Sequence, residues 1–486
     1  MTHITSHISF KELSCVICVM CNIQRMLPYL KKFHINKQGN LLLFVMIFGS
    51  LAFTMIVMGV SSYALFENQA SNRKQLRDLS FHIAEAGINY YRWHLAHSPE
   101  DYQDGTGEAG PYVHAFEDKN GDVIGYFSLE IDPPLPGTTI VNFRSTGWTI
   151  AQPQNTRTIG VRVGYPALTD FSFVENSDMS FSYTTEVHGK VHSNGGIEFN
   201  GTTDSLLQSA KETYRPAGES QDKPGIWGDG GPTTFWEYPV PPKDFDSITT
   251  DLSSIRDAAD AGGLHFYSSG DEGYHMVFQA DGTFRLFLVT RRRGYTDLCK
   301  VVYDGWCYSG TVYYDIRNET ELGTYTIPDN GAIFVEDDVW VEGVVNGHVT
   351  VGAGRFPVLE STYQEIYPVG NITLNEKESD DVLGLIAQGD IVYPRNTPDD
   401  MTLEAALLSQ FKEIYRPYYQ NSIKNSLTIF GSQISYAGGG VKWGNPVVSG
   451  FINTSYIYDG NLRYLVPPGF PVEPTYELIS WEEIET

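Results

Sequence analysis

A long apolar run followed by an amphipathic stripe is the first pattern in the chain. Residues 40–66 carry no charge, and about 20 apolar residues are enough to cross a hydrocarbon core. Beyond this run, apolar or small side chains recur at spacings of three and four, namely Leu76, Leu79, Ile83, Gly87, Tyr90 and His94. That spacing places them on one face of a helix. Pro99 ends the pattern, because the residue before a proline disfavours helical geometry. We therefore predict one continuous helix from Leu41 to about His97.

Four segments with alternating apolar and polar residues follow the helix. They are 112–116, 123–131, 138–148 and 156–163. The first two flank Asn120-Gly121, a dipeptide that favours a tight hairpin turn. Alternation with a period of two is typical of antiparallel strands that are buried on one face. We predict that the helix packs on a four-stranded antiparallel sheet.

From Pro166 onward the pattern changes to short apolar strands separated by glycine corners. It recurs at 187–201, 331–354, 382–394 and 427–440. Such recurrence is typical of stacked coils in which each rung buries its side chains on the next. We predict a mainly β fold in which a right-handed parallel β-helix-like domain follows the antiparallel sheet. A β-sandwich with irregular hairpins is the alternative.

A segment with a different hydrophobic pattern, about 203–327, interrupts these coils. Residues 246–261 show helical spacing of apolar side chains, whereas 274–279 and 283–290 alternate on either side of a turn. We predict a small α+β insertion here. Outside this insertion, among the last coils, a second helix is predicted over 403–413.

The charge of the chain narrows the classes of partner. The chain has 59 acidic and 33 basic residues, with a formal net charge of −26. Such a chain repels phosphate backbones, which excludes nucleic acid as a partner.

Four basic residues precede the apolar run, namely Arg25, Lys31, Lys32 and Lys37. Basic residues mark the cytoplasmic side of a membrane segment. We expect a single-pass membrane protein with a cytoplasmic N-terminus and its bulk extracellular or periplasmic.

Three kinds of N-terminal segment place an apolar run behind basic residues. A cleaved secretory signal has a run of only about 7–15 residues and a small-residue cleavage site, neither of which this chain shows. An uncleaved anchor and a prepilin-type leader both fit. In a prepilin, a peptidase removes the leader and the apolar helix packs against its copies in a filament.

Residues 36–97 resemble the type IV pilins, most of all the PilX-type minor pilins and related pseudopilins. The resemblance rests on QGNLLLFVMIFGSLAFTMIVMG and LRDLSFHIAEAGINYYRWHL, with Ala84-Glu85-Ala86-Gly87 as its most specific part. It implies cleavage between Gly39 and Asn40, and contact of the helix with membrane lipid and other pilin subunits. Phe44 stands where the family usually has glutamate. A start at Met26 would give a leader of ordinary length, so residues 1–25 are interpreted as a misplaced start.

These patterns divide the chain into four parts. They are a basic leader over 1–39, a transmembrane helix over 40–66, a pilin-like helix and sheet over 67–165, and a β-helix-like surface domain over 166–486.

The exterior resembles a group of uncharacterised pilin-like surface proteins of uncultivated small-genome bacteria. The segments that carry this are VHSNGGIEFNG, GAIFVEDDVWVEGVVNGHVTV, DVLGLIAQGDIVYP and SGFINTSYIYD. The resemblance implies an architecture and a cell-surface setting. It implies no catalytic residue and no cofactor.

The five cysteines fall into two groups. The spacing of Cys299 and Cys307 fits a disulfide across a turn, which an oxidising exterior permits; two free buried thiols are the alternative. Cys15, Cys18 and Cys21 have iron–sulfur-like or zinc-like spacing but no fourth ligand nearby. We interpret their spacing as chance, and predict no metal site.

Several polar groups in the sequence are candidates for metal binding or for contact with a partner. Asp118–Asp122 departs from a calcium loop at Val123 and Leu129, where that loop needs glycine and glutamate, so we predict a plain hairpin turn. His188 and His192 are expected to face solvent. Arg291-Arg292-Arg293 is expected in an exposed loop, where it could dock an acidic partner.

Two acidic clusters could supply paired carboxylates for sugar cleavage or a calcium site. They are Glu336-Asp337-Asp338 and Ser379-Asp380-Asp381. Because the chain is so acidic, such clusters arise by chance, and we predict no catalytic residue. The expected function is that of a membrane-anchored cell-surface structural protein, a minor pilin or pilus-associated component with a displayed adhesive β-domain. Surface glycans or a host-cell surface are candidate partners. An uncleaved surface adhesin and a membrane-tethered carbohydrate-active enzyme are the alternatives.

Overall fold

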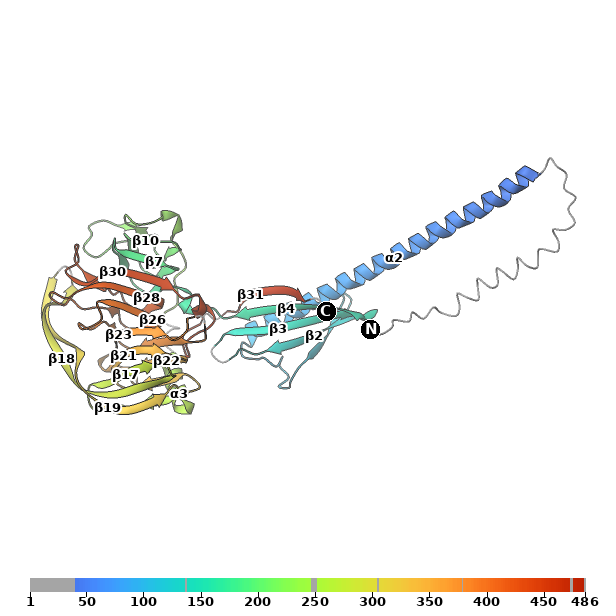
Figure 1. The fold of residues 1–486 in the computed structure, drawn as a ribbon. Helices are drawn as coiled ribbons and strands as arrows, with labels where there is room; N and C mark the ends of the chain where they lie inside the picture. The colour runs from blue at the N-terminus through green and yellow to red at the C-terminus, as the bar shows by residue number, and fades with distance from the viewer. Residues whose placement is uncertain are drawn as a thin grey trace. The chain divides into compact units, whose positions relative to one another are not determined.

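The fold is taken from a computed structural model that describes residues 40–135, 138–245, 251–303, 306–377, 379–472 and 475–484 (Figure 1). The side chains of Asn40, Asp251, 297–303 and 306–309 are not described. The chain divides into two compact units at Leu79 and Ser80. As predicted, the protein is mainly β, with a long N-terminal helix, an antiparallel sheet on which it packs, and a large mixed, mostly parallel sheet.

The N-terminal helix is α2 (Asn40–His97), which confirms the predicted continuous helix. Within the first unit, all residues from 41 to 75 are exposed, including the whole apolar run. The helix is long and apolar enough to cross a membrane. In the second unit the helix buries one face, made of Ile83, Ala84, Gly87, Ile88, Tyr91 and Leu95.

The antiparallel sheet has five strands in the order β1-β2-β3-β4-β31. Their bounds are β1 (Tyr112–Glu117), β2 (Val123–Asp132), β3 (Ile140–Thr149), β4 (Gln152–Gly164) and β31 (Glu477–Ile484). The four predicted strands are confirmed. The fifth, β31, comes from the far end of the chain and adds to the free edge of β4. Sequence pattern did not predict it, because β31 is largely exposed.

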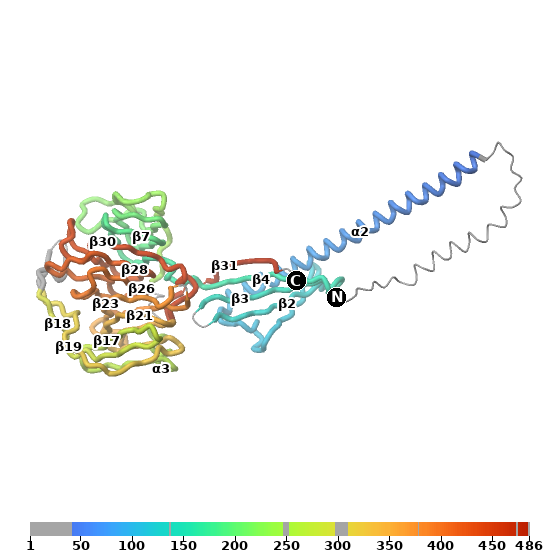
Figure 2. Tube along the Cα trace, in the orientation of Figure 1, coloured from blue at the N-terminus to red at the C-terminus, as the bar shows by residue number. Residues whose placement is uncertain are grey.

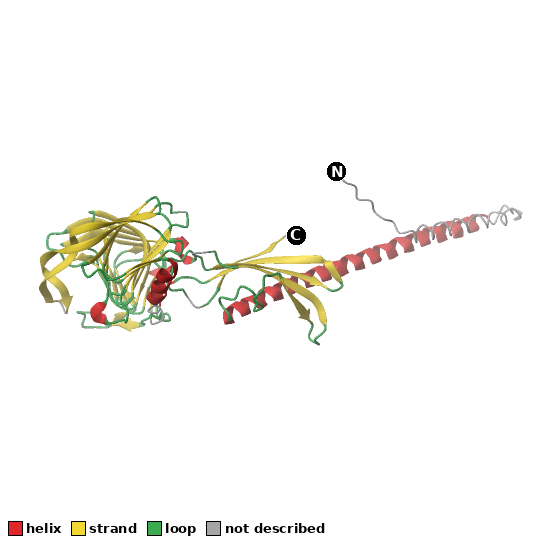
Figure 3. Cartoon of the chain, turned by 90° about the horizontal axis from the view of Figure 1, so that it is seen from below, coloured by secondary structure: helices red, strands yellow, loops and turns green. Residues whose placement is uncertain are grey.

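Two glycines let the helix approach the sheet closely (Figure 3). A Cβ at Gly147 of β3 would lie 2.4 Å from the backbone nitrogen of Ala84 and 2.4 Å from the carbonyl oxygen of Ser80. A Cβ at Gly87 of α2 would lie 2.2 Å from Ser145 Oγ. A larger residue at Gly147 would meet the helix backbone, and one at Gly87 would displace the side chains of Ser145 and Phe127.

The parallel domain (residues 166–472) is built on two long ladders of strands. The first is parallel throughout. In spatial order it contains β15 (Trp236–Glu237), β11 (Leu207–Ser209), β8 (Val191–Ser193), β5 (Phe173–Glu175), β28 (Ile423–Ser435), β26 (Asp400–Ser409), β24 (Val382–Ala387), β22 (His348–Ala353), β20 (Ala332–Val335) and β16 (Leu264–Phe266).

The second ladder shares β26 and β28 with the first. In spatial order it contains β10 (Thr202–Thr203), β7 (Thr185–His188), β30 (Ser449–Tyr458), β28, β26, β23 (Ile366–Leu374), β21 (Val339–Val345) and β17 (Gly273–Gln279). Beyond β17, the strands β18 (Thr283–Tyr303) and β19 (Trp306–Thr326) extend it as a long antiparallel ribbon.

Short strands complete the domain. The parallel ones are β25 (Ile391–Val392), β27 (Ile414–Tyr415), β6 (Met179–Phe181), β9 (Ile197–Phe199) and β14 (Ile226–Trp227). The antiparallel ones are β12 (Thr213–Tyr214), β13 (Lys223–Pro224) and β29 (Lys442–Trp443). Apolar side chains from successive strands stack inside the ladders as one core, which includes Val191, Leu385, Leu407 and Leu427.

The chain enters the parallel domain in the middle of the first ladder, at β5. From there it adds strands outward to β15, and it then crosses to the opposite end of the ladder through α3 (Asp251–Gly262). It then winds back from β16 until β28 pairs with β5. Figure 2 shows the same closure on the second ladder, where green β7 lies beside red β30. The β28–β5 pairing, called the seam below, thus joins segments that are far apart in the sequence.

Two predicted helices had different outcomes. Of the one predicted at 246–261, residues 246–250 lie outside the described residues and the rest is present as α3, whose buried Leu252, Ile255 and Ala259 lie in a second hydrophobic cluster. The one predicted at 403–413 is wrong, because that segment contains most of strand β26. β26 is buried on both faces, so its continuous apolar run lacks the alternation that identifies a strand.

Candidate functional site

The N-terminal candidate is the apolar half of α2. Within the described part of this unit its large side chains are exposed; for example, Leu41 is 81% exposed and Phe66 is 72% exposed. A contiguous apolar surface of this kind marks contact with lipid or another protein. The predicted cleavage residue Gly39 lies outside the described residues, as do Cys15, Cys18 and Cys21, and the side chain of Asn40 is not described. Cleavage therefore stays a prediction.

The predicted disulfide also stays a prediction. Cys299 lies in β18 and Cys307 in β19, and the two strands pair antiparallel. Their side chains lie outside the described part of the chain.

The Asp118 loop is a hairpin turn between β1 and β2. One carboxylate oxygen of Asp118 accepts hydrogen bonds from the backbone nitrogens of Asn120 (2.8 Å) and Asp122 (3.0 Å). These hydrogen bonds lower the pKa of Asp118. The carboxylate is thus engaged in holding the turn. Across the described residues, no group of three His, Cys, Asp or Glu side chains is arranged to hold a metal ion.

The two histidines lie on different strands. His188 of β7 is exposed and contacts Asp204 (2.7 Å), as expected for a solvent-facing side chain. For His192 of β8 the expectation is wrong: the side chain is buried and contacts Asn194 (3.0 Å). The corner at Gly189, with φ of +136°, separates the two strands.

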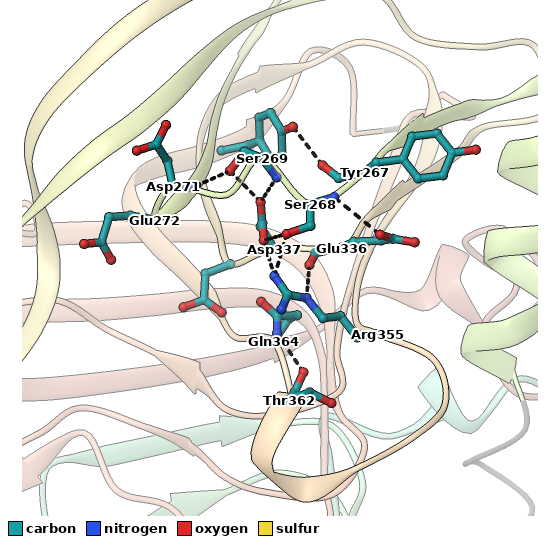
Figure 4. Close-up of polar contacts among 12 residues, drawn as sticks. Tyr267, Ser268, Ser269, Asp271, Glu272, Glu336, Asp337, Arg355, Thr362 and Gln364 are labelled. Atoms are coloured by element: carbon teal, nitrogen blue, oxygen red, sulfur yellow. Dashed lines mark hydrogen bonds and ion pairs between the residues drawn. The ribbon is translucent and has the colours of Figure 1, made fainter.

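The acidic residues of the cluster at 336–338 contact different partners. Asp337 is buried and accepts hydrogen bonds from both Oγ and N of Ser269 (2.6 Å each) and from Arg355 (2.5 Å) (Figure 4). Glu336 contacts His265 (3.4 Å) instead. Through these contacts Asp337 holds the loop that contains Ser268 and Ser269 (Figure 4).

The second acidic cluster is engaged in backbone contacts. Asp381 is buried and accepts hydrogen bonds from the backbone nitrogens of Gly347 (2.6 Å) and Glu376 (2.9 Å). Ser379 donates to the carbonyl oxygen of Glu376 (2.7 Å). Asp380 is exposed. The structure therefore does not bring paired catalytic carboxylates together in this cluster.

One carboxylate per rung stacks at a single corner of the parallel domain. Val339, Ile366, Ile391 and Ile414 are partners in consecutive strands, so the residues that precede them are also in register. These four acids form the carboxylate column, namely Asp338, Glu365, Asp390 and Glu413. The Glu365 nitrogen donates to Asp338 (2.7 Å), and the Glu413 nitrogen donates to Asp390 (2.8 Å).

Burial and mutual repulsion control the charge of the column. Burial, together with the neighbouring Asp338, raises the pKa of Glu365 to about 7. Burial and Asp390 likewise raise the pKa of Glu413 to about 7. The pKa of Asp338 and of Asp390 is also raised by burial. Near neutral pH, part of the column is thus protonated, which relieves the cost of stacking like charges.

Arg292 supplies the positive charge at one end of the column. Its guanidinium donates to Asp338 (2.6 Å) and to the hydroxyl of Tyr367 (3.0 Å), and it lies over the ring of Trp340 (4.8 Å). The prediction that Arg291-Arg292-Arg293 occupies an exposed loop is wrong, since all three lie in β18 and Arg292 is half-buried. The pairing of β18 with β19 in the ribbon places Arg292 at the corner where the carboxylate column lies.

The ribbon β18–β19 covers the aromatic side chains next to the column. Trp340 and Tyr367 are fully buried, and the Trp340 indole donates to the carbonyl oxygen of Tyr314 in β19 (2.7 Å). A pocket of about 430 Å³ nearby is lined by Glu272, Arg291, Arg292 and Tyr313. The column does not contribute to its lining. Two of its acids, Asp338 and Asp390, accept hydrogen bonds from the backbone of the next rung and so hold the corners together.

A sequence pattern could have located the column. An acid followed by isoleucine or valine, and then an aromatic residue or valine, occurs at Asp338, Glu365, Asp390 and Glu413. It recurs about every 25 residues, within the range of known solenoid repeats. Apolar runs and glycines do not reveal it, because the acid precedes the first apolar residue of each rung.

Comparisons with known proteins show similarity to solved structures. The chain matches no protein-family profile and no curated protein. Among solved structures, the competence-associated pilin ComZ from Thermus thermophilus is similar, with a TM-score of 0.33 and 12% sequence identity. The match covers 83% of this chain and 96% of that one.

Proposed function

We propose that this protein is a membrane-anchored cell-surface structural protein, a minor pilin or pilus-associated component that displays the parallel domain as an adhesive module. The observation that carries the proposal is the division of α2. Among the described residues, the side chains of its apolar half are exposed, whereas its other half is buried on an antiparallel sheet. The first half therefore contacts membrane lipid before assembly and the helices of other pilin subunits afterwards.

Processing of the N-terminus tests the pilin part of this proposal. Mass spectrometry of the mature protein should find Asn40 as its first residue. The variant Gly39→Leu should keep the leader, whereas the control Gly49→Leu should be cleaved normally, because a Cβ at Gly49 meets no atom within 4 Å. A wild-type protein that retains its encoded N-terminus would contradict cleavage and favour the uncleaved adhesin.

Filament fractions test the pilus part. Sheared surface filaments should contain the processed protein, and cells expressing Gly39→Leu should retain it in the membrane. If processed protein stays in the membrane and is absent from filaments, the protein is a tethered adhesin that does not enter a pilus.

We further propose that the displayed domain is not an enzyme. The acids suggested by sequence are engaged: Asp337 and Asp381 hold backbone groups and neighbouring side chains, and Asp338 binds Arg292. Incubation of the full-length protein with neutral and acidic polysaccharides should release no reducing ends. Release that is lost in Glu365→Gln would establish the tethered hydrolase instead.

A further inference from the structure

A shallow groove crosses the outside of the second ladder, over β28, β30, β7 and β10. Its volume is about 230 Å³, and seven of its eleven lining residues are serine or threonine. The only charged side chain in the lining is Glu186. The groove is therefore a surface of hydrogen-bonding groups with little charge, set on a rigid sheet.

Four of the lining side chains form a straight row across four strands. Thr428 is the partner of Ser455, Ser455 of Glu186, and Glu186 of Thr202. Residues directly opposite each other in a sheet point to the same face, and neighbouring strands lie about 4.8 Å apart. This spacing is comparable to the length of one hexose unit in an extended glycan.

The hydroxyl groups of this row are available. Within the described part of the chain, the side chains of Thr428, Ser455 and Thr202 make no hydrogen bond to another residue. Each hydroxyl can donate one hydrogen bond and accept two, which suits the hydroxyl groups of a sugar. The Glu186 carboxylate adds an acceptor in the middle of the row.

A second layer fixes the edge of the groove. The Lys442 ammonium donates to the hydroxyl oxygens of Thr184 and Thr454 (3.1 Å each) and to the carbonyl oxygen of Ile452 (3.2 Å). The Thr184 hydroxyl also donates to Ile452 (2.6 Å), and Thr185 and Thr454 contact each other through their hydroxyls (2.9 Å). Because these groups hydrogen-bond to one another, the edge of the groove keeps its shape. The hydroxyl groups of the row remain available to bind a ligand.

An aromatic ring stands at one end of the groove. Tyr183 is 60% exposed, and its hydroxyl donates to Asp229 (3.2 Å), which fixes the orientation of the ring. An exposed aromatic face beside directed hydrogen-bonding groups can take the apolar face of a sugar ring, with stacking and polar recognition acting together.

The charges around the groove select against anionic ligands. Asp229 holds Tyr183 at one end, Glu186 lies in the row, and Asp400 accepts from Ser426 at the other side (2.6 Å). The Lys442 ammonium, which contacts Thr184 and Thr454 of the lining, is occupied by oxygen atoms of the protein. With a net charge of −26 on the chain, a uronate or sulfated glycan would be repelled.

From this arrangement we propose that the groove over β28, β30, β7 and β10 is a binding site for a neutral polysaccharide, which lies across the row with one sugar ring on Tyr183. The proposal rests on the proposed function, because it supplies the ligand class and the site for the adhesive module.

The test is a binding measurement on the full-length protein in a detergent without a sugar headgroup. Calorimetric titration would use three neutral polysaccharides (a soluble β-glucan, a mannan and a galactan) and one acidic polysaccharide, polygalacturonate. We expect binding to at least one neutral polysaccharide and none to polygalacturonate. Binding of polygalacturonate alone, or of none of the four, would overturn the proposal.

Variants locate the site. Thr428→Val combined with Ser455→Ala should weaken binding roughly tenfold, and Tyr183→Ala by a similar factor, since each removes contacts worth about one tenfold step. Tyr183→Phe keeps the ring but loses its hydrogen bond to Asp229, and should weaken binding less than Tyr183→Ala. The matched control is Thr373→Val, which makes the same change on β23, outside the groove. If the control weakens binding as much as the groove variants, or if the groove variants have no effect, the ligand lies elsewhere.

The same variants separate this proposal from the function on which it rests. If Tyr183→Ala loses polysaccharide binding but is still cleaved and recovered in filaments, both proposals stand. If the native protein is cleaved and enters filaments but binds no neutral polysaccharide, only the groove is overturned. If it binds polysaccharide and is absent from filaments, the groove stands and the pilus function fails.

Discussion

The two sheets of this protein bury their side chains in different ways. Along β3 of the antiparallel sheet, buried residues alternate with residues that are at least partly exposed. β24 of the parallel domain buries all six of its residues. The antiparallel sheet packs one face on α2, whereas a central strand of the parallel domain has core on one side and covering segments on the other. The contrast shows how the same strand geometry can carry two hydrophobic patterns, depending on how many faces are covered.

The two regions also differ in how the chain connects their strands. In the antiparallel sheet, β1 to β4 follow one another, and only β31 comes from elsewhere. In the parallel domain, the central pairing at the seam joins β5 to β28, and neither half has a complete stack of neighbours without the other. Local hairpins can form early and independently, whereas the seam requires closure of a very long loop.

Substitutions at adjacent positions test the burial contrast most strongly. In β26, Leu407 and Leu408 belong to two different buried clusters, so Leu407→Ala and Leu408→Ala should each destabilise the protein by about 2–5 kcal/mol. In β4, Val161→Ala should destabilise the protein, but its exposed neighbour Arg162→Ala should not. Chemical denaturation of the full-length protein in detergent measures all four. Equal results for Leu408→Ala and Arg162→Ala would contradict the two-sided burial of β26.

The close contact between α2 and the antiparallel sheet gives the next effect. Gly147→Val should destabilise the protein by about 1–3 kcal/mol, because its side chain would meet the helix backbone. The control is Gly440→Val in the parallel domain, where a Cβ meets no atom within 4 Å. Chemical denaturation should therefore separate the two variants. If Gly147→Val proves as stable as Gly440→Val, the helix does not lie against β3 at this distance.

The carboxylate column makes the stability of the parallel domain depend on pH. Folding raises the pKa of Glu365 to about 7, from about 4.3 in an unfolded chain. The folded state therefore binds more protons than the unfolded state between these values, so the stabilisation is complete below about pH 4 and is lost as the pH rises to about 7. Thermal unfolding should show a higher midpoint at pH 5 than at pH 8.

The variant Glu365→Gln identifies the source of this dependence. A neutral amide cannot ionise, so the variant should be more stable than the native protein at pH 8 by about 1–3 kcal/mol and should depend less on pH. Glu482→Gln, an exposed acid on β31 of the antiparallel sheet, is the matched control and should leave the pH profile unchanged. An unchanged profile in Glu365→Gln would mean that the column is already ionised when folded.

The smallest effect is expected at the added strand of the antiparallel sheet. Trp481 of β31 is 43% exposed, and its ring lies 5.9 Å from that of Phe81 on α2. Trp481→Ala should therefore lower stability by only about 0.5–1.5 kcal/mol. Leu478→Ala, a similarly exposed side chain on the same strand, is the control. A loss of several kcal/mol in Trp481→Ala would show that β31 is as important to this sheet as its central strands.

Much of the fold could be predicted where contacts are local. The long helix follows from apolar spacing in a single segment, and the four strands β1 to β4 follow from alternation and a tight turn at Asn120-Gly121. The segment 403–413 could not be predicted as a strand, because its nearly complete burial removes the alternation that separates strand from helix. Of the candidate site, the apolar surface of α2 could be predicted, but the groove could not. Its row draws Thr202 and Glu186 from one half of the winding, and Thr428 and Ser455 from the other.

The sequence by itself determined the apolar helix, the antiparallel meander and the stacked character of the later strands, because each depends on the spacing of side chains within one short segment. Only the tertiary structure decided that the winding begins in its middle, that β31 returns to the first sheet, and that Arg292 meets Asp338 at the corner of the column. Those features depend on which distant strands become neighbours. Hydrogen bonding between backbones can join any two strands of compatible pattern, so the choice among them is made by packing of the whole domain.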